Sequence, residues 1–301
     1  GLLLYATFLM VPLVRLRQGF KDFRFLGALM VLNFVLVPVV VFLLTRFIAG
    51  DQVLLVGVLF VLLTPCIDYV IVFTHFAGGA SERLLSATPL LMIGQVFLLP
   101  VYLWLFVGTE FVRSVDFAPF LEAFGLLIVA PLCAAGLTQF AAARTSWGKK
   151  LADGVSAGQI LADGVSAAMV PLMMATLAII VASQIFKVTH QLGKLVVVVP
   201  LYVAFAMIMI AAGAVVSRAA GLGIASQRAV VFSAVTRNSL VVLPLVLALP
   251  AQFELAPLVV VTQTLVELCI MLVMIWALPR ILKPQVALGA RSQDSLRLLN
   301  D

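Results

Sequence analysis

Charged residues are scarce in this chain of 301 residues: 11% are Asp, Glu, Lys or Arg, whereas soluble domains carry about 25%. Hydrophobic residues make up 64%, against roughly 45–50% in soluble domains, and the mean hydropathy is +1.22. So few charges cannot cover the surface of a water-soluble globule, which excludes a secreted enzyme and a disordered chain. The composition indicates a polytopic membrane protein with all-α architecture.

Cysteine and histidine are also rare. The three cysteines, Cys66, Cys133 and Cys269, lie inside apolar runs, so they form no disulfide framework. The two histidines, His75 and His190, are distant in the sequence, and neither an HExxH motif nor a phosphate-binding GxxxxGK[ST] motif is present. We therefore expect no metal site and no cofactor, and we do not expect an enzyme.

Long apolar runs dominate the chain. A spanning helix needs about 20 mostly apolar residues. Eight stretches meet this length: 25–45, 53–74, 84–108, 117–141, 164–186, 195–217, 224–249 and 255–278. A ninth stretch, 1–14, is too short to cross, and we expect it to be the end of a span whose beginning is missing.

The basic residues predict an orientation. The net charge is +6, but the Lys and Arg residues form short clusters between apolar runs without interleaved aromatics, so we expect no nucleic-acid partner. If the loop 15–24 is cytoplasmic, 14 of the 19 Lys and Arg residues lie on the cytoplasmic side, 4 lie opposite, and Arg237 lies within a span. This bias predicts a multi-pass protein of the inner (plasma) membrane with a cytoplasmic C-terminus.

The longest polar connection, 142–163, divides the chain. The near-repeat LADGVSAGQI–LADGVSAAMV begins inside it, and we interpret the repeat as a local duplication. Counting the 117–141 span with the rear part gives two comparable sets, each with an interrupted span followed by an uninterrupted one, which is typical of inverted-repeat transporters. We predict an N-terminal repeat, 1–116, and a C-terminal repeat, 117–301, with the cytoplasmic linker 142–163 and a cytoplasmic tail, 279–301.

Two spans carry polar residues near their middle. The 53–74 span contains Pro65 and Asp68, and the 224–249 span contains Arg237 and then Pro244. Because proline removes a backbone donor and clashes with the preceding turn, we expect both helices to kink or break. Backbone groups freed inside a membrane must face protein or a water-filled cavity.

Asp68 and Arg237 are the deepest opposite charges in the chain. Buried charges in membranes are costly and usually functional, so we predict that the two pair where the interrupted helices meet. A purely structural ion pair is the alternative. If transport and folding both survive Asp68→Asn, the functional hypothesis is wrong.

Other polar residues accompany this pair. Around a break beside Pro65, Cys66 could reach the same cavity as Asp68, although a buried cysteine is most often a small hydrophobe. Glu267 follows Gln263 by one helical turn and is either a proton carrier or an interhelical hydrogen-bond partner. The candidate substrate-binding residues are Cys66, Asp68, Arg237, Asn238 and Ser239, and the candidate coupling or path-lining residues are Glu267, Gln263 and Asn33.

Three patches resemble a known family. The stretch PCIDYVIVFTHFAGG, 65–79, resembles the fourth-span motif of arsenite efflux permeases, a branch of the bile acid:sodium symporter superfamily. Asn33 to Pro38 resembles the Asn-x-x-x-x-Pro signature of the preceding span, and Thr236 to Ser239 resembles the polar crossing of the ninth span. The resemblance implies ten spans in two inverted five-helix repeats, with panel and core domains and two crossing broken helices. About nine of the ten spans would be present here. It also implies that Cys66 matches a cysteine essential for arsenite transport.

The sequence departs from this pattern in two places. The permeases carry a glutamate shortly after the crossing, near Leu240 here, and the sodium-coupled members carry one where this chain has Ser233. A missing carboxylate beside a fixed cation, Arg237, argues against a sodium site. We therefore expect proton coupling through Asp68 or Glu267, or an electrogenic uniport.

The predicted function is a secondary transporter that exports arsenite by alternating access, with Cys66 touching the metalloid. The alternative is an organic-anion symporter of the same fold, whose substrate charge would meet Arg237. The sequence contains no paired catalytic constellation that would favour a membrane-embedded enzyme, and nothing in it indicates the pore ring of a channel.

Overall fold

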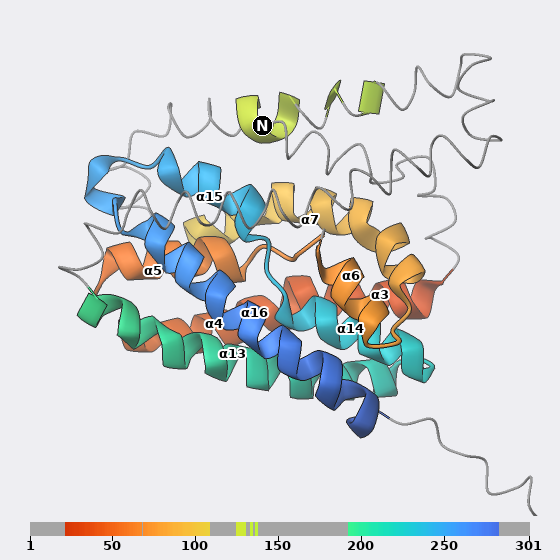
Figure 1. Ribbon diagram of the computed structural model, residues 1–301. Coiled ribbons are helices and arrows are strands. Elements are labelled where there is room, and N and C mark those ends of the chain that lie inside the picture. The colour runs from red at the N-terminus through yellow and green to blue at the C-terminus, as the bar shows by residue number, and fades with distance from the viewer. Residues whose placement is uncertain are drawn as a thin grey trace, which may run out of the picture.

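The computed structural model describes residues 22–67, 69–108, 125–130, 133–134, 136–137 and 192–282. Every element in these ranges is helical, and no strand occurs among them (Figure 1). Four helices there are long and apolar enough to cross a membrane: Phe23–Ile48, Ser81–Val107, Leu195–Ala219 and Ala251–Ile281. They confirm the predicted spans 25–45, 84–108, 195–217 and 255–278.

The described helices form two sets with the same order: a long helix, an interrupted helix and another long helix. The first set is α3 (Phe23–Val31), η2 (Leu32–Leu36), α4 (Val37–Thr45), η3 (Arg46–Ile48), α5 (Gln52–Leu62), α6 (Tyr69–Phe76) and α7 (Ser81–Val107). The second set is α13 (Leu192–Ala219), α14 (Ile224–Val235), α15 (Ser239–Leu247), η5 (Ala251–Phe253) and α16 (Ala256–Ile281). Between the sets, a short π-helical turn, η4 (Gly125–Val129), is described.

Several predictions concern residues outside this description. The short stretch 1–14, the span 164–186 and the linker 142–163 lie outside the described residues, as does most of the span 117–141. Asp68, the predicted partner of Arg237, also lies outside them.

The first long helix changes its winding around Pro38. A proline has no N–H, so the carbonyl of Phe34 loses its usual helical donor, and the hydroxyl of Tyr102 in α7 donates to it at 2.6 Å. The π-helical turn η2 precedes Pro38 and contains Asn33, which is fully buried. Such a turn changes the direction in which side chains leave the helix, and here it accompanies an inward-facing Asn33.

Both polar spans are broken, as predicted. The first break separates α5, which ends at Leu62, from α6, and the second separates α14, which ends at Val235, from α15. Pro65 lies in the first break, but Pro244 lies inside α15. The expectation that proline interrupts both spans is therefore right for the first and wrong for the second, where the polar residues after Val235 form the break.

The broken helices pack against the long ones. α13 packs against α14 and α16, and α16 packs against α5 and α15 (Figure 1). Two glycines permit close approach: a Cβ at Gly57 would lie 2.9 Å from Cβ of Val259, and one at Gly213 would lie 3.1 Å from Cα of Val231. Small residues at such contacts are a common means of packing membrane helices.

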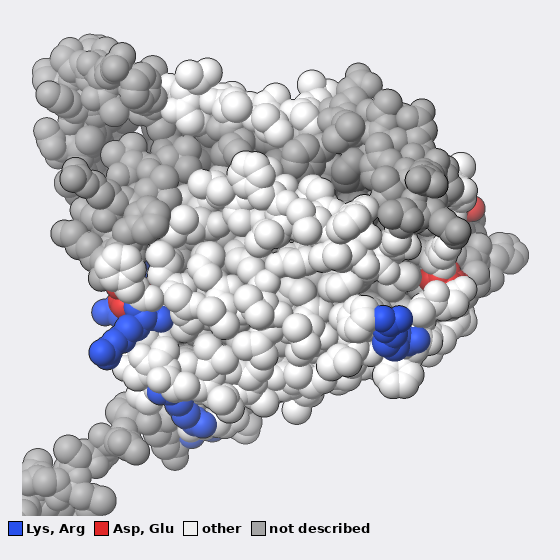
Figure 2. Space-filling view, turned by 180° about the vertical axis from the view of Figure 1, so that it is seen from behind, with Lys and Arg blue, Asp and Glu red and all other residues white. Residues whose placement is uncertain are grey.

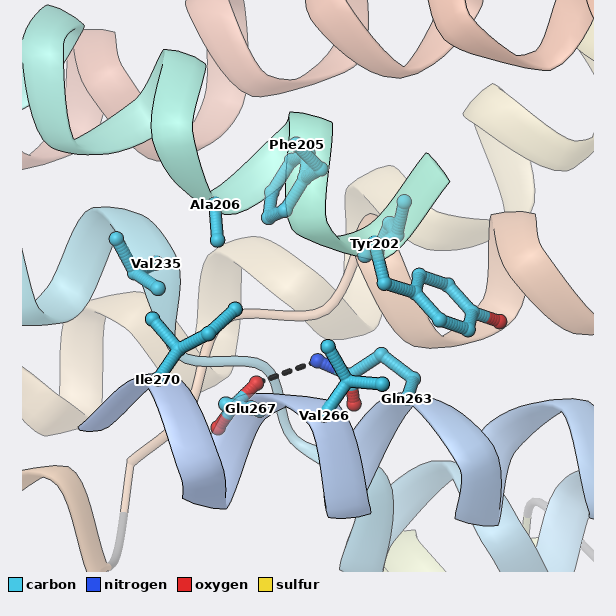
Figure 3. Close-up of a pocket in the computed structure, with 9 residues that line it drawn as sticks. Tyr202, Phe205, Ala206, Val235, Gln263, Val266, Glu267 and Ile270 are labelled. Atoms are coloured by element: carbon cyan, nitrogen blue, oxygen red, sulfur yellow. Dashed lines mark hydrogen bonds between the residues drawn. The ribbon is translucent and has the colours of Figure 1, made fainter. Parts of the chain in front are cut away.

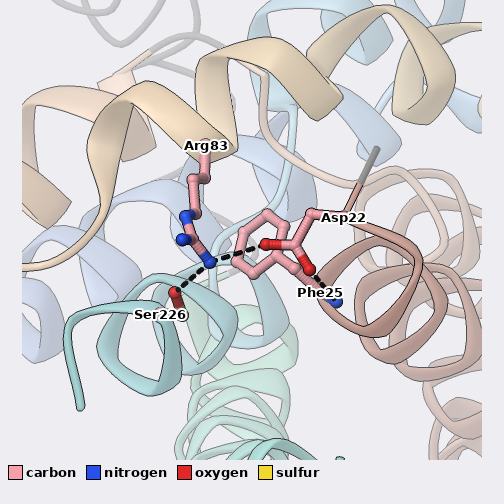
Figure 4. Close-up of polar contacts among 4 residues, drawn as sticks. All are labelled: Asp22, Phe25, Arg83 and Ser226. Carbon is pink, nitrogen blue, oxygen red and sulfur yellow. Dashed lines mark hydrogen bonds and ion pairs between the residues drawn. The ribbon is translucent and has the colours of Figure 1, made fainter. Parts of the chain in front are cut away.

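Charged side chains on the face shown in Figure 2 lie toward its two ends, with a broad uncharged area between them. Apolar side chains such as Phe47, Phe97 and Trp276 are exposed on the outer surface, as expected for helices that face lipid. At one end, Arg83 of α7 contacts Asp22 Oδ2 at 2.6 Å and Ser226 Oγ at 3.2 Å (Figure 4), which ties together the starts of α3, α7 and α14.

Candidate functional site

The two breaks lie against each other as a short antiparallel pairing. The N–H of Cys66 donates to the carbonyl of Thr236 at 3.2 Å, and the N–H of Asn238 donates to the carbonyl of Thr64 at 2.8 Å. These bonds satisfy backbone groups that the broken helices leave free, which a membrane interior requires. The interrupted spans therefore meet at one point within the fold.

Arg237, at the centre of the second break, sends its side chain into the interior. It is completely buried, and Nη1 donates to the carbonyl of Leu62 at 3.3 Å. Nη2 donates to Oδ1 of Asn33 at 3.0 Å and to the carbonyl of Ser233 at 2.8 Å, and it also contacts the carbonyl of Ala234. The guanidinium is thus surrounded by neutral protein oxygens.

The position of these oxygens explains how a buried cation is tolerated. Leu62 is the last residue of α5, and Ser233 and Ala234 belong to the last turn of α14. Carbonyls at a helix C-terminus lack intrahelical partners and carry the negative end of the helix dipole, so they favour a cation. The ring of Phe205 in α13, centred 5.5 Å from Cζ, adds a cation–π contact.

Asn33 is fixed by further bonds. Its Nδ2 donates to the carbonyl of Leu29 and to Oγ of Ser233, both at 3.1 Å, so its oxygen faces Arg237. The first long helix is thereby connected to the second break. The structure brings Asn33 and Arg237 together, a contact that the sequence analysis, which placed Asn33 among the coupling or path-lining candidates, did not predict.

Glu267 of α16 faces the other side of the second break. Its Oε2 accepts from the backbone N–H of Arg237 at 2.8 Å and from Nε2 of Gln263, and its Oε1 accepts from the hydroxyl of Tyr69 at 2.8 Å. The carboxyl group is buried. Glu267 therefore reaches Arg237 through the main chain, while the guanidinium is held by the carbonyls on the opposite side.

A small cavity, with room for about one water molecule, lies beside Glu267 (Figure 3). Side chains from α13, α16 and the ends of α5 and α14 line it, among them Tyr202, Phe205, Gln263 and Glu267. Within the described part of the chain, Oε1 of Gln263 has no hydrogen-bond partner although it is buried. The cavity thus offers hydrogen-bond acceptors, an amide oxygen and a carboxylate, in an otherwise apolar lining.

The remaining predicted residues lie at the crossing with different roles. Cys66 is completely buried and does not line this cavity. Oδ1 of Asn238 caps α15 by accepting from the N–H of Val241 at 3.2 Å. Nδ2 of Asn238 and Oγ of Ser239 have no partner among the described residues. Because Asp68 lies outside them, its pairing with Arg237 stays a prediction.

Sequence reasoning missed the role of Tyr69. The residue follows Asp68 in the motif. Its hydroxyl could have drawn attention to it, because a buried tyrosine in an apolar span needs a hydrogen-bond partner. The partners, Glu267 and Arg237, come from the other set of helices, and no local pattern shows them. Within the described ranges, no group of three His, Cys, Asp or Glu residues could hold a metal ion.

Comparison with known families gives one match. The model of the Sodium Bile acid symporter family matches residues 1–191. This region contains Asn33 and the first break, whereas the second break and Glu267 lie beyond it. No curated protein matches the chain.

Proposed function

The chain belongs to the sodium bile acid symporter family, and on that premise we propose that it is a secondary transporter that couples to protons and exports arsenite by alternating access. Members of the family are membrane transporters, so the chain is a multi-pass membrane protein with a small-molecule substrate. The observation that carries the coupling proposal is the guanidinium of Arg237 among oxygens at the ends of two broken helices.

Such oxygens are the ligands that a transporter offers to Na⁺. Unwound carbonyls and the C-terminal ends of half-helices coordinate coupling ions at the centre of inverted-repeat transporters. Here Leu62, Ser233 and Asn33 direct their oxygens at Nη1 or Nη2 of Arg237. A tethered cation occupies the place where a bound ion would sit, so the proposed cycle needs no Na⁺ there. Glu267 is the proposed proton-binding group, with Asp68 as a second candidate.

The acceptor-lined cavity supports a small, uncharged substrate. In this structure the cavity has room for about one water molecule, so a substrate enters only when the crossing moves, and a small substrate requires the least movement. Undissociated arsenite, As(OH)₃, is neutral and carries three O–H donors, which would match Gln263 Oε1 and the Glu267 carboxylate. In the proposed cycle, movement at the crossing exposes the thiol of Cys66 to the metalloid.

The organic-anion alternative gains no support from this geometry. It requires an anion to meet Arg237, but the guanidinium is completely buried and both of its terminal nitrogens donate to the protein. A carboxylate, Glu267, borders the cavity instead and would repel an anion. We therefore keep arsenite as the proposed substrate.

The proposed arrangement in the membrane follows the charge bias of the sequence. We place the end that carries Arg83 and Arg228 in the cytoplasm of an inner-membrane protein, with the C-terminus on the same side. The two sets of described helices would be parts of two inverted repeats, 1–116 and 117–301. Reporter fusions at the C-terminus and in the loop near Arg113 test this orientation, because only the second should be outside.

Arsenite resistance tests the substrate. In a host that lacks its own arsenite efflux, the wild-type chain should restore growth and lower cellular arsenic, and Cys66→Ser should lose both effects. Cys269→Ser is the matched control, because Cys269 lies on the exposed surface of α16, and it should behave as wild type. Resistance that is equal with Cys66→Ser, or absent with the wild type, contradicts the arsenite proposal.

Sodium tests the coupling. Arsenite flux in proteoliposomes should follow a pH gradient and should not change when Na⁺ replaces K⁺ on both sides. Removal of the tethered cation by Arg237→Ala should free the carbonyls for a small ion, so NaCl should raise the thermal stability of this variant but not of the wild type. Sodium-dependent flux by the wild type would overturn the proposal of proton coupling.

A further inference from the structure

The hydroxyl of Tyr69 lies between two acceptors. It is 2.8 Å from Oε1 of Glu267 and 2.9 Å from the carbonyl oxygen of Arg237. A tyrosine hydroxyl has one proton to donate and lone pairs with which to accept. It therefore cannot give a full hydrogen bond to both oxygens while Glu267 is an ionised carboxylate.

A proton on Glu267 resolves this competition. When Glu267 is ionised, the proton of Tyr69 is drawn to the charged Oε1, because hydrogen bonds to a charged acceptor are the stronger ones. When a proton from water adds to Oε1, the new O–H of Glu267 donates to the oxygen of Tyr69. The hydroxyl of Tyr69 then turns its own proton to the carbonyl of Arg237. One proton enters, and no covalent bond among the heavy atoms changes.

We propose that Tyr69 is a positioning residue that couples protonation of Glu267 to the second break: the direction of its hydrogen bond reverses and the carbonyl of Arg237 gains a donor. This inference rests on the proposed proton coupling and deepens it. In the protonated state α6 is bonded directly to the backbone of the second break, and in the ionised state it is bonded to α16 instead. The strength with which α6 holds the crossing then depends on the proton.

The surroundings of Glu267 fit this role. The groups that face it are Tyr69 from α6, the backbone N–H of Arg237 from the second break, Gln263 from its own helix, and Tyr202 across the cavity from α13. The guanidinium of Arg237 and the thiol of Cys66 are the other ionisable groups at the crossing; Asp68 lies outside the described residues. Two donors on Oε2 hold the carboxyl group in place in either protonation state. The cavity beside Glu267 provides space for the water that delivers the proton.

Infrared difference spectroscopy on the purified full chain, between acidic and alkaline pH, tests the switch without a substrate. The wild type should gain a protonated-carboxyl C=O band together with a change in a tyrosine ring mode, and both should share one titration midpoint. Glu267→Gln should lose both signals. Tyr69→Phe should lose the tyrosine signal and shift the frequency of the carboxyl band, because the acid loses its acceptor.

Tyr202→Phe is the matched control. Tyr202 borders the same cavity, but its hydroxyl donates to the carbonyl of Val259 at 3.0 Å, so this variant should keep both signals at the wild-type frequency. If the tyrosine change is missing in the wild type, or persists in Tyr69→Phe, the proposal is wrong. A wild-type spectrum without the tyrosine change overturns the proposal even where a variant fails to fold.

Flux measurements separate this proposal from the substrate proposal. In proteoliposomes loaded with arsenite, Tyr69→Phe should lose the stimulation by a pH gradient but retain arsenite exchange at equal pH, whereas a merely structural role would reduce both alike. Wild-type protein with the paired infrared signals but without arsenite flux would sustain the switch and reject the substrate. Unchanged pH stimulation in Tyr69→Phe would overturn the switch even if arsenite is exported.

Discussion

The two breaks share one main-chain pairing but have different central residues. Thr64 and Cys66 flank Pro65 at the first break, as Thr236 and Asn238 flank Arg237 at the second, and the flanking residues exchange two main-chain hydrogen bonds. In each break the threonine hydroxyl also donates to the carbonyl four residues earlier, at 2.8 Å. The main-chain hydrogen bonds of the crossing do not involve the side chain of Arg237, whose guanidinium makes separate contacts.

The long helices that follow the two breaks also differ in the hydrogen bonding of their buried polar residues. Gln95 of α7 and Glu267 of α16 hold equivalent positions in the two sets of helices, because they are as far apart in the sequence as Thr64 and Thr236. Gln95 is buried, and neither of its polar atoms has a partner in the described part of the chain, whereas Glu267 accepts three hydrogen bonds. Among the described residues, the second break therefore has more hydrogen-bonded polar surroundings than the first.

The largest expected effect comes from removing the charge that distinguishes the breaks. Arg237→Met leaves the carbonyls of Leu62 and Ser233 without donors and Glu267 without a nearby cation, and we expect a loss of about 3–5 kcal/mol in unfolding free energy. Denaturation in mixed micelles, followed by tryptophan fluorescence, measures it. Arg237→Lys keeps the charge but has a single donor centre, so its unfolding free energy should lie between those of the wild type and Arg237→Met. Wild-type stability in Arg237→Met would show that the breaks are energetically alike.

A matched pair of substitutions tests whether the buried polar residues of α16 and α7, Glu267 and Gln95, contribute differently to stability. Glu267→Met removes the acceptor for Tyr69, Gln263 and the backbone of Arg237, and we expect a loss of about 2–4 kcal/mol by the same unfolding measurement. Gln95→Met removes a buried group that lacks partners, so stability should be unchanged or slightly higher. Similar losses in both variants would mean that Gln95 has a polar role like that of Glu267.

Asn33 links the first long helix to the second break, and we expect its substitution to lower stability less than the substitutions of Arg237 and Glu267. Asn33→Leu removes the bonds to Arg237 and Ser233, which should cost about 1–3 kcal/mol and reduce arsenite flux. Asn33→Gln retains the amide on a longer side chain and should recover part of both. A stable and active Asn33→Leu would show that the carbonyls alone suffice for Arg237.

The smallest effect should be equal at the two breaks. Thr64→Val and Thr236→Val each remove one hydroxyl bond to a preceding carbonyl, and each should lower stability by about 0.5–1.5 kcal/mol. Parallel unfolding curves of the two variants measure the difference. A much larger loss at one threonine would show that the two matching hydroxyl bonds do not contribute equally to stability.

Much of the fold could be predicted from the chain. Apolar runs marked the four described long helices, and the polar interruptions around Pro65 and Arg237 marked both breaks, because hydropathy and charge are local properties. Pro244 misled the prediction at the second break, since α15 accommodates it. The partners of Arg237 were missed for a different reason: the carbonyls of Leu62 and Ser233 are backbone groups that any residue carries, so no residue type signals them.

Composition and hydropathy were enough to predict a membrane-embedded helical protein, in which two spans with polar interruptions differ from the plain apolar ones. A chain with so few charged residues cannot form a stable water-soluble domain. In lipid, helices form because they provide the hydrogen bonds of the backbone N–H and C=O groups internally. The fold was needed to show that helix-end carbonyls hold Arg237 and that Tyr69 lies between Glu267 and the second break. These contacts join residues far apart in the chain, and packing alone sets which donor meets which acceptor.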